Sequence, residues 1–176
     1  SESTLRSATG LVDLLGYQSD SEGPIADPFG ALSELPATHP LYNVGEDGIR
    51  KSLECFDSVV GDAYVGAHTD QNALVTTQMG TPKPTARYPR SFAPGLLSRE
   101  GDMLLLGLDG FPGLDGEFAA AELSARDLPY RVHGANVDLL GDVPVEQPRI
   151  RLANALERND PLPNRVGTIR DALAEA

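Results

Sequence analysis

The sequence predicts an α/β fold, and three consecutive features of the chain indicate it. Met103 to Leu108 is a short apolar run typical of a buried strand, and a glycine-rich loop follows it. Tyr130 to Val137 can form a second strand. Between them, apolar residues recur at helical spacing at Leu114, Phe118, Ala121, Ala125 and Leu128. Such a Rossmann-like strand–helix–strand unit is expected to form a parallel pair with a right-handed crossover.

Further helices are predicted from capping residues and apolar spacing. Asp27 precedes Pro28 as an N-cap precedes a proline at the first helical position. The short apolar face that follows holds Phe29, Leu32 and Leu35, and Pro36 ends it. A longer amphipathic helix is predicted to end at Gly61, from the spacing of Ile49, Leu53, Phe56 and Val60.

The remaining elements are read from composition. Ala73 to Met79 is β-branched and apolar enough for a strand. The next six residues, 80–85, include two prolines and can form neither a helix nor a central strand. Apolar spacing over 150–156 and 166–173 predicts two more helices.

Charge is the most informative property of the composition. The 176 residues include 26 acidic and 14 basic side chains, for a net charge of -12. Only Lys51 and Lys83 are lysines. An acid-rich, lysine-poor surface is typical of proteins adapted to very high salt, where screening shortens repulsion to about 3 Å at 1 M. The alternative is an ordinary acidic protein of the cytosol, and neither interpretation favours a nucleic-acid partner.

Cysteine content and hydropathy exclude several classes. Cys55 is the single cysteine, which excludes an internal disulfide and a cysteine-based metal or iron–sulfur site. No apolar run approaches the roughly 20 residues of a membrane span. The chain starts on Ser1 without a methionine, so we expect a piece of a longer intracellular protein.

The glycine-rich loop and the histidines are weak candidates for chemistry. Backbone amides between Gly107 and Gly116 can cradle a phosphate at a helix N-terminus, but a turn-rich connection with helix caps is the favoured interpretation. The histidines at 39, 68 and 133 show no metal-ligand spacing, so no metal site is predicted, and His39 is expected in a loop.

Two segments are stronger candidates for binding. Ser7, Ala8, Thr9 and Gly10 are small and partly hydroxyl-bearing, so this backbone can approach a flat cofactor closely. Between Thr81 and Arg90, three prolines stiffen a stretch that also holds three cations, which are Lys83, Arg87 and Arg90. Rigid cations suit an anionic ligand, and the alternative is a solvated loop whose cations pair with nearby acids.

Several segments, in order along nearly the whole chain, resemble the B subunit of anaerobic glycerol-3-phosphate dehydrogenases. The first resembles a Ser-rich stretch that ends in Gly-x-x-Asp-Leu-Leu, and the third a strand before a Gly-Thr-x-x-Pro-Thr loop. The segments are 3–15, 37–42, 74–84, 103–137 and 150–156. Each motif is modest, and their collinear order carries the resemblance.

The resemblance implies a two-lobed flavoprotein of the FAD-dependent oxidoreductase superfamily. Residues 1–23 would belong to the flavin-binding lobe and residues 24–176 to the cap-like middle region. Ser7, Ala8, Thr9 and Gly10 would then contact FMN or FAD in the full-length protein, and Lys83, Arg87 and Arg90 would face substrate. Ala8 replaces a hydroxyl residue often found in the family.

The implied complex contains an FAD-bearing A subunit together with an iron–sulfur C subunit that docks on the membrane. It would oxidise sn-glycerol 3-phosphate to dihydroxyacetone phosphate and pass electrons to quinone, as a cytoplasmic complex attached peripherally to the membrane. No residue stands out as the general base for the C2 hydroxyl proton, and removal of this proton is left open as a task of the A subunit.

The chain departs from the family pattern in one large respect, which keeps two alternatives open. The strand with G-x-G-x-x-G and the C-terminal flavin-contacting segment are absent from these 176 residues, so this chain alone is expected to be inactive and to bind no flavin. The alternatives are another flavin oxidoreductase related to fumarate reductase, or a non-catalytic module that joins subunits.

Overall fold

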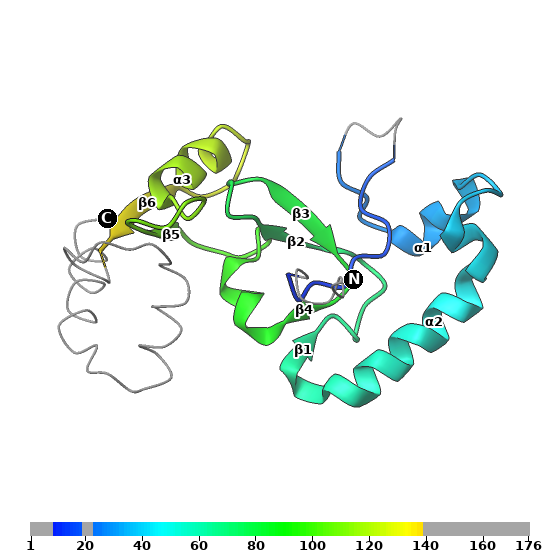
Figure 1. Cartoon of the computed structure of the whole chain (residues 1–176). Helices are drawn as coiled ribbons and strands as arrows, with labels where there is room; N and C mark the ends of the chain where they lie inside the picture. Colours follow the sequence, from blue (N-terminus) through cyan, green and yellow to red (C-terminus); the bar gives the residue numbers. More distant parts are fainter. Residues whose placement is uncertain (1–8, 19–22, 139–176) are drawn as a thin grey trace. The chain divides into compact units, whose positions relative to one another are not determined.

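The computed structural model describes residues 9–18 and 23–138. The chain divides into two compact units, whose elements Figure 1 shows. The first unit comprises Ser1–Val75 with Pro82–Arg99, and the second comprises Thr76–Thr81 with Glu100–Ala176. The helices predicted over 150–156 and 166–173 lie outside the described residues.

The first unit opens with the short helix that Asp27 and Pro28 predict. Helix α1 (Pro28–Ala31) begins after Asp27, whose carboxylate accepts a hydrogen bond from the Gly30 amide at 3.0 Å. A 3₁₀ turn, η2 (Leu32–Glu34), continues it. The apolar face is confirmed, because Phe29, Leu32 and Leu35 are all buried.

Helix α2 (Pro40–Val60) is the longest described helix and ends at Gly61 as predicted. It starts further upstream than the apolar spacing indicates, because His39 caps it: Nδ1 accepts from the Leu41 amide at 3.2 Å. Gly45 interrupts it with a φ of 72°. The first half of the predicted stripe is buried, because Ile49 and Leu53 join the cluster that also holds Leu15, Phe29, Leu32 and Leu35, whereas Phe56 and Val60 are only half-buried.

Short strands complete the first unit. Strand β1 (Tyr64–Val65) follows the 3₁₀ turn η3 (Gly61–Ala63) and pairs antiparallel with β4 (Tyr88–Pro89), which leads into η4 (Arg90–Gly95). Strand β2 (Ala73–Thr76) pairs with β3 (Pro82–Thr85) in a two-stranded sheet. The prolines of β3 therefore occupy an edge strand, which agrees with their expected exclusion from a central one.

Strand β2 is shorter than the predicted run, which extended to Met79. The chain turns after Thr76 because the Thr77 hydroxyl accepts from the amides of Met79 and Thr81, each at 3.2 Å. Gly80 supports this turn with a φ of 71°. A side-chain hydroxyl that bonds its own backbone competes with strand formation.

The second unit contains the predicted strand–helix–strand unit. Strand β5 (Met103–Leu108), helix α3 (Gly116–Ser124) and strand β6 (Val132–Val137) follow one another along the chain. The two strands are parallel, with Met103 opposite Val132 and Leu108 opposite Val137. The prediction of a parallel pair joined by a helix is confirmed.

The buried face of α3 differs from the predicted one. Ala119, Ala120 and Leu123 are buried, whereas Phe118 is 43% exposed. The reason is the closeness of helix and sheet: a Cβ added to Gly134 of β6 would lie 2.6 Å from Glu117 Cα and 2.8 Å from Ala120 Cβ. Only small residues fit this contact, so the larger phenylalanine lies outside it.

Candidate functional site

The two segments predicted to bind ligands lie next to each other in the first unit. Ser7 and Ala8 are outside the described residues, and Thr9 and Gly10 are within them. Val12 donates its amide to the Arg87 carbonyl at 2.9 Å. A Cβ at Gly10, whose φ is 80°, would lie 3.3 Å from Pro89 Cγ. The structure thus brings together two stretches that the sequence separates by more than 70 residues.

Gly10 is required by this packing alone, because a side chain at its positive φ would be strained and would press on Pro89. Thr9 is exposed. Its role in binding therefore stays a prediction.

Arg87 of the basic segment is engaged inside the protein. The residue is only 7% exposed. Its Nε lies 2.9 Å from Asp57 Oδ1, its Nη2 lies 3.0 Å from Asp57 Oδ2, and its Nη1 donates to the Ala86 carbonyl at 2.9 Å. This two-pronged ion pair ties α2 to the strands on either side of Arg87, which gives the guanidinium a structural task.

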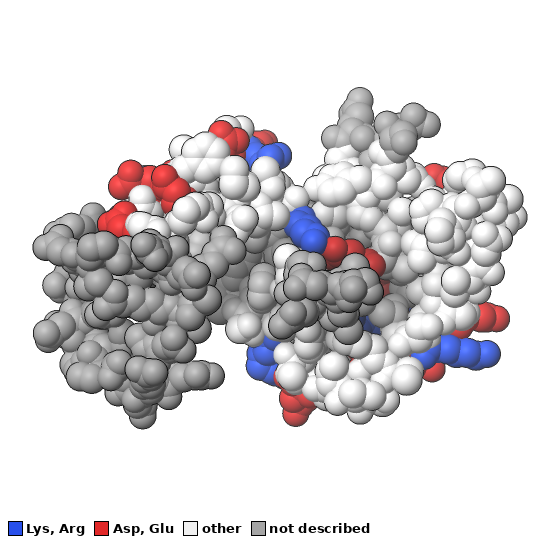
Figure 2. Space-filling view, viewed as in Figure 1, with Lys and Arg blue, Asp and Glu red and all other residues white. Residues whose placement is uncertain are grey.

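Lys83 and Arg90 also meet acids of the same chain, but they keep access to solvent. Lys83 Nζ lies 2.8 Å from Asp13 Oδ2, with 33% of its side chain exposed. Arg90 donates from Nε to the Asp62 carbonyl at 2.8 Å, and 64% of its side chain is exposed. On the face shown in Figure 2, cations are scattered beside carboxylates and no broad basic patch forms. Arg87 therefore fits the alternative of a loop whose cations pair with nearby acids. Lys83 and Arg90 keep enough exposed side chain to contact an anion as well.

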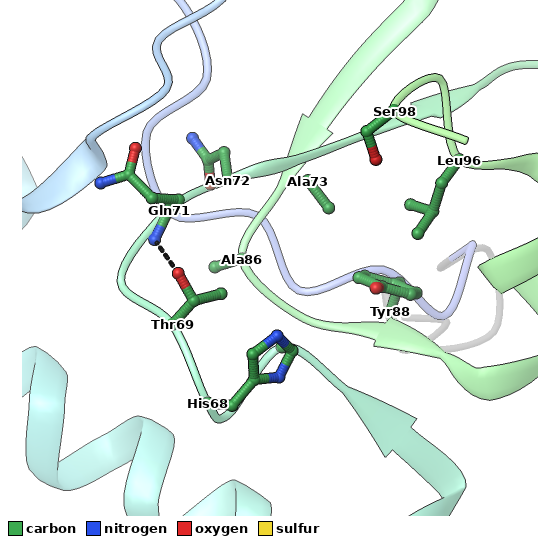
Figure 3. A pocket seen from close by; sticks show the side chains of 10 residues that line it. His68, Thr69, Gln71, Asn72, Ala73, Ala86, Tyr88, Leu96 and Ser98 are labelled. Carbon is green, nitrogen blue, oxygen red and sulfur yellow. Dashed lines mark hydrogen bonds between the residues drawn. The ribbon is translucent and has the colours of Figure 1, made fainter. Parts of the chain in front are cut away.

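A pocket of about 250 Å³ opens in the first unit, beside the basic segment (Figure 3). Ala86 and Tyr88, which flank Arg87 in the sequence, line it. The other lining residues come from the loop before β2, the first residue of that strand and the turn after η4: Gly66, His68, Thr69, Gln71, Asn72, Ala73, Leu96 and Ser98. None of these residues was predicted from the sequence to bind a ligand, and His68 was considered only as a metal ligand and set aside.

The loop that carries most of the pocket is held to α2. Arg50 donates to Asp70 at 3.0 Å and to Glu46 at 2.8 Å, and its guanidinium lies 3.9 Å from the centre of the Phe29 ring. The hydrogen bond from Arg50 lowers the pKa of Asp70, and the two carboxylates raise the pKa of Arg50. Both partners are exposed, so the link orders the loop more than it stabilises the fold.

The glycine-rich loop of the second unit is a capped connection, as the favoured interpretation predicts. Asp115 accepts from the Phe118 amide at 3.1 Å and from Asn136 Nδ2 at 3.0 Å, and these bonds lower its pKa. Asn136 Oδ1 in turn accepts from the Gly116 amide at 2.8 Å. The first amide of α3 and a neighbouring carboxylate are thus already committed, which disfavours a phosphate at this helix N-terminus.

The histidines are dispersed. His39 caps α2, His68 lies at the pocket and His133 is in β6. Within residues 9–18 and 23–138, no group of three or more histidine, cysteine, aspartate or glutamate residues is arranged to hold a metal ion.

Comparison with known proteins tests the resemblance seen in the sequence. Two curated proteins from two strains of Halobacterium salinarum, each described as the probable B subunit of an anaerobic glycerol-3-phosphate dehydrogenase, are 45% identical to this chain over 158 residues. The chain is homologous to these proteins. The match covers 90% of the chain and 37% of each relative, so the chain spans well under half of the length of these relatives.

The homology confirms the resemblance to the B subunit of anaerobic glycerol-3-phosphate dehydrogenases, including its link to halophiles. No family model matches the chain. No solved structure matches it either. Among the described residues, no helix combines the length and apolar character that crossing a bilayer requires.

Proposed function

We propose that the full-length protein containing this chain is the B subunit of a flavin-dependent anaerobic glycerol-3-phosphate dehydrogenase. The single observation that carries this proposal is the 45% identity over 158 residues to two proteins described by that name. The reaction would oxidise the C2 hydroxyl of sn-glycerol 3-phosphate to the ketone of dihydroxyacetone phosphate. Two electrons and two protons leave the substrate, and quinone receives the electrons.

A bound flavin, FMN or FAD, would accept the electrons, and this chain would contribute binding and orientation. Thr9 fits a flavin contact because it is an exposed, hydroxyl-bearing residue. The neighbouring Gly10 is compatible with such a role but is already explained by its packing on Pro89. Ser7 and Ala8 complete the proposed segment.

Lys83 and Arg90 are the proposed contacts to an anionic group, which is the substrate phosphate in the first instance. Each is paired with a carboxylate yet partly exposed, so an anion of higher charge can take over the pairing. The rigid prolines of the segment limit the entropy lost when it binds. Arg87 belongs to the same proposal, but its ion pair with Asp57 predicts a strong effect on folding as well.

The proposed partners are an FAD-bearing A subunit together with an iron–sulfur C subunit, which would hold the protein at the membrane periphery. The description of the relatives as one lettered subunit supports a complex of several chains. In this arrangement residues 1–23 would be part of the flavin-binding lobe and residues 24–176 would form the cap-like middle region.

The experiment is a kinetic comparison in the assembled complex with the full-length B subunit. Lys83→Gln and Arg90→Gln should each lower kcat/KM for glycerol 3-phosphate by about 10- to 100-fold if the side chain contacts substrate, the range expected for a hydrogen bond to a charged group. Arg99→Gln is the matched control, because Arg99 donates to the Pro94 carbonyl outside the basic segment.

Other outcomes assign the segment differently. Reduced flavin content at unchanged substrate kinetics would indicate a flavin contact, and weakened assembly would indicate a partner contact. Normal kinetics, flavin content and assembly in both variants would show that the cations only pair with Asp13 and Asp62, and the proposed anion contact would then be wrong.

A further inference from the structure

The pocket of the first unit has a preformed frame. Gly66 has a φ of 117°, and its Cα faces the Ala86 backbone so closely that no Cβ can be accommodated. The Thr69 hydroxyl accepts from the Gln71 amide at 3.1 Å, and the Asn72 amide donates to the Ala26 carbonyl at 2.8 Å. Together with the anchor of this loop on Arg50, these bonds fix the wall of the pocket before any ligand arrives.

Two polar side chains that line this pocket each carry an atom without a hydrogen-bond partner within the described part of the chain. Asn72 uses its Nδ2 twice, to the carbonyls of Leu15 at 2.8 Å and Ile25 at 2.9 Å. These bonds fix the amide orientation and leave Oδ1 buried without a hydrogen-bond partner. Because Oδ1 has almost no accessible surface, a ligand in the pocket cannot reach it, and Asn72 contributes to the wall of the pocket through its bonds to Leu15 and Ile25.

The second atom is the hydroxyl of Tyr88. The residue is only 5% exposed and lines the pocket, and no hydrogen bond from its hydroxyl is found in the described ranges. Buried tyrosines usually pair their hydroxyl, so this one is available to a ligand. Figure 3 shows that Tyr88 lines the same space as His68, Leu96 and Ser98.

The lining offers no fixed charge. No lysine, arginine, aspartate or glutamate is among the ten residues, and the nearest loop acid, Asp70, stays ionised because its pKa is lowered. The whole chain carries a net charge of -12. An anion would enter against this field with no cation in the pocket to receive it, so an uncharged ligand fits better.

We propose that this pocket binds a small uncharged polyol. Such a ligand carries hydroxyls that exchange hydrogen bonds with Tyr88 and Ser98, and its carbon chain lies against Ala73, Ala86 and Leu96. Polar groups that fix orientation in a partly apolar cavity are the usual composition of a small-molecule site.

The size of the pocket supports a ligand of this class. Its volume of about 250 Å³ is many times the 10–15 Å³ that one water requires, and it is below the roughly 300–1,000 Å³ of sites for drug-sized ligands. A three- or four-carbon polyol fits within these bounds. The site is independent of the proposed redox activity, because it needs neither flavin nor an anionic substrate.

Glycerol is the probe for the test, in the full-length protein, with ligand-observed saturation-transfer NMR. Wild type should bind glycerol saturably with a dissociation constant on the order of millimolar. Tyr88→Phe removes only an unpartnered hydroxyl, so the melting temperature should not fall, while affinity should drop about 5- to 10-fold, as expected for one neutral hydrogen bond. Tyr42→Phe, at an exposed position of α2, should leave binding unchanged.

Three results would overturn the proposal. One is the absence of saturable glycerol binding up to about 0.1 M, a hundred times the expected constant. Another is binding that Tyr88→Phe does not weaken, because glycerol would then occupy another place. The last is tighter binding of glycerol 3-phosphate than of glycerol with the same dependence on Tyr88, because the ligand would then be an anion. All three results concern ligand binding at Tyr88. They can therefore be distinguished from the kinetic effects of Lys83→Gln and Arg90→Gln, which test the proposed function.

Discussion

Arg87 is the residue whose loss should damage the first unit most. Its guanidinium holds Asp57 of α2 through three close nitrogen–oxygen contacts and holds the Ala86 carbonyl through a fourth. Replacement of Arg87 by methionine keeps much of the side-chain volume and removes all of these bonds. Asp57 is then left with a charge that the fold no longer compensates.

The expected cost follows from burial. Removal of one partner from a fully buried ion pair costs about 3–5 kcal/mol. The Arg87 side chain is 9% exposed but that of Asp57 is 21% exposed, so water can partly solvate the stranded carboxylate. We therefore expect Arg87→Met to lower the free energy of unfolding by about 3 kcal/mol, at the low end of that range. Asp57→Asn should cost less, because its amide oxygen still accepts from Arg87.

Denaturant unfolding at fixed high salt, on full-length protein, measures this. Arg90→Met is the matched control: it lies in the same segment and is 64% exposed, so its cost should stay below about 1 kcal/mol. The double variant Arg87→Met with Asp57→Leu should recover part of the loss, with a coupling of about 1–3 kcal/mol. If Arg87→Met and Arg90→Met cost the same, the ion pair does not secure α2 and our reasoning fails.

Three further predictions concern the whole chain and the second unit. With 26 acidic against 14 basic residues, the melting temperature should rise steeply from roughly 0.1 M to several molar KCl, and a flat curve would contradict salt adaptation. Because hydrogen bonds lower the pKa of folded Asp115, its contribution is present above the unfolded pKa of about 3.9 and is lost as pH falls through the folded pKa. The gap in stability between wild type and Asp115→Asn, which keeps a capping oxygen but cannot titrate, should therefore narrow below about pH 4; a gap that stays constant would contradict this. Gly134→Ala should destabilise by about 1–3 kcal/mol, because its Cβ meets backbone of α3, whereas Gly95→Ala has free space and should be nearly neutral.

The elements of the second unit were predictable because their signals are local. The apolar run 103–108, the glycines after it and Asp115 as a cap each act within a few residues. The inward face of α3 was not predictable from apolar spacing. It depends on Gly134, which follows the helix in the chain and admits only small residues such as Ala120 against the sheet.

The start of α2 at His39 has a sequence signal, a capping residue directly before a proline, that the apolar spacing alone does not include. Asp27 before Pro28 was interpreted as a cap, and His39 before Pro40 is the same arrangement with a ring nitrogen as acceptor. Histidine is a less common cap than aspartate, so the apolar spacing from Ile49 dominated the prediction.

The candidate site depended on contacts between distant parts of the chain. The basic segment was found from its composition, but composition does not reveal that Arg87 meets Asp57 of α2 while its neighbours Ala86 and Tyr88 line a pocket. Alternation along an extended segment places adjacent residues on opposite faces, and which face is internal is decided by long-range packing. The unpaired Asn72 Oδ1 is likewise visible only once Leu15 and Ile25 take both amide hydrogens.

The most direct test of the proposed function is the oxidation of sn-glycerol 3-phosphate by a complex reconstituted with and without the full-length B subunit. Reduction of an artificial acceptor and the flavin absorbance of the purified full-length protein would be measured in the same preparation. We expect a yellow protein, glycerol 3-phosphate-dependent acceptor reduction when it is present, a large loss when it is omitted, and no reaction with succinate. A colourless protein whose omission leaves the rate unchanged would identify a non-catalytic module, and a preference for succinate would place the protein with another branch of flavin oxidoreductases.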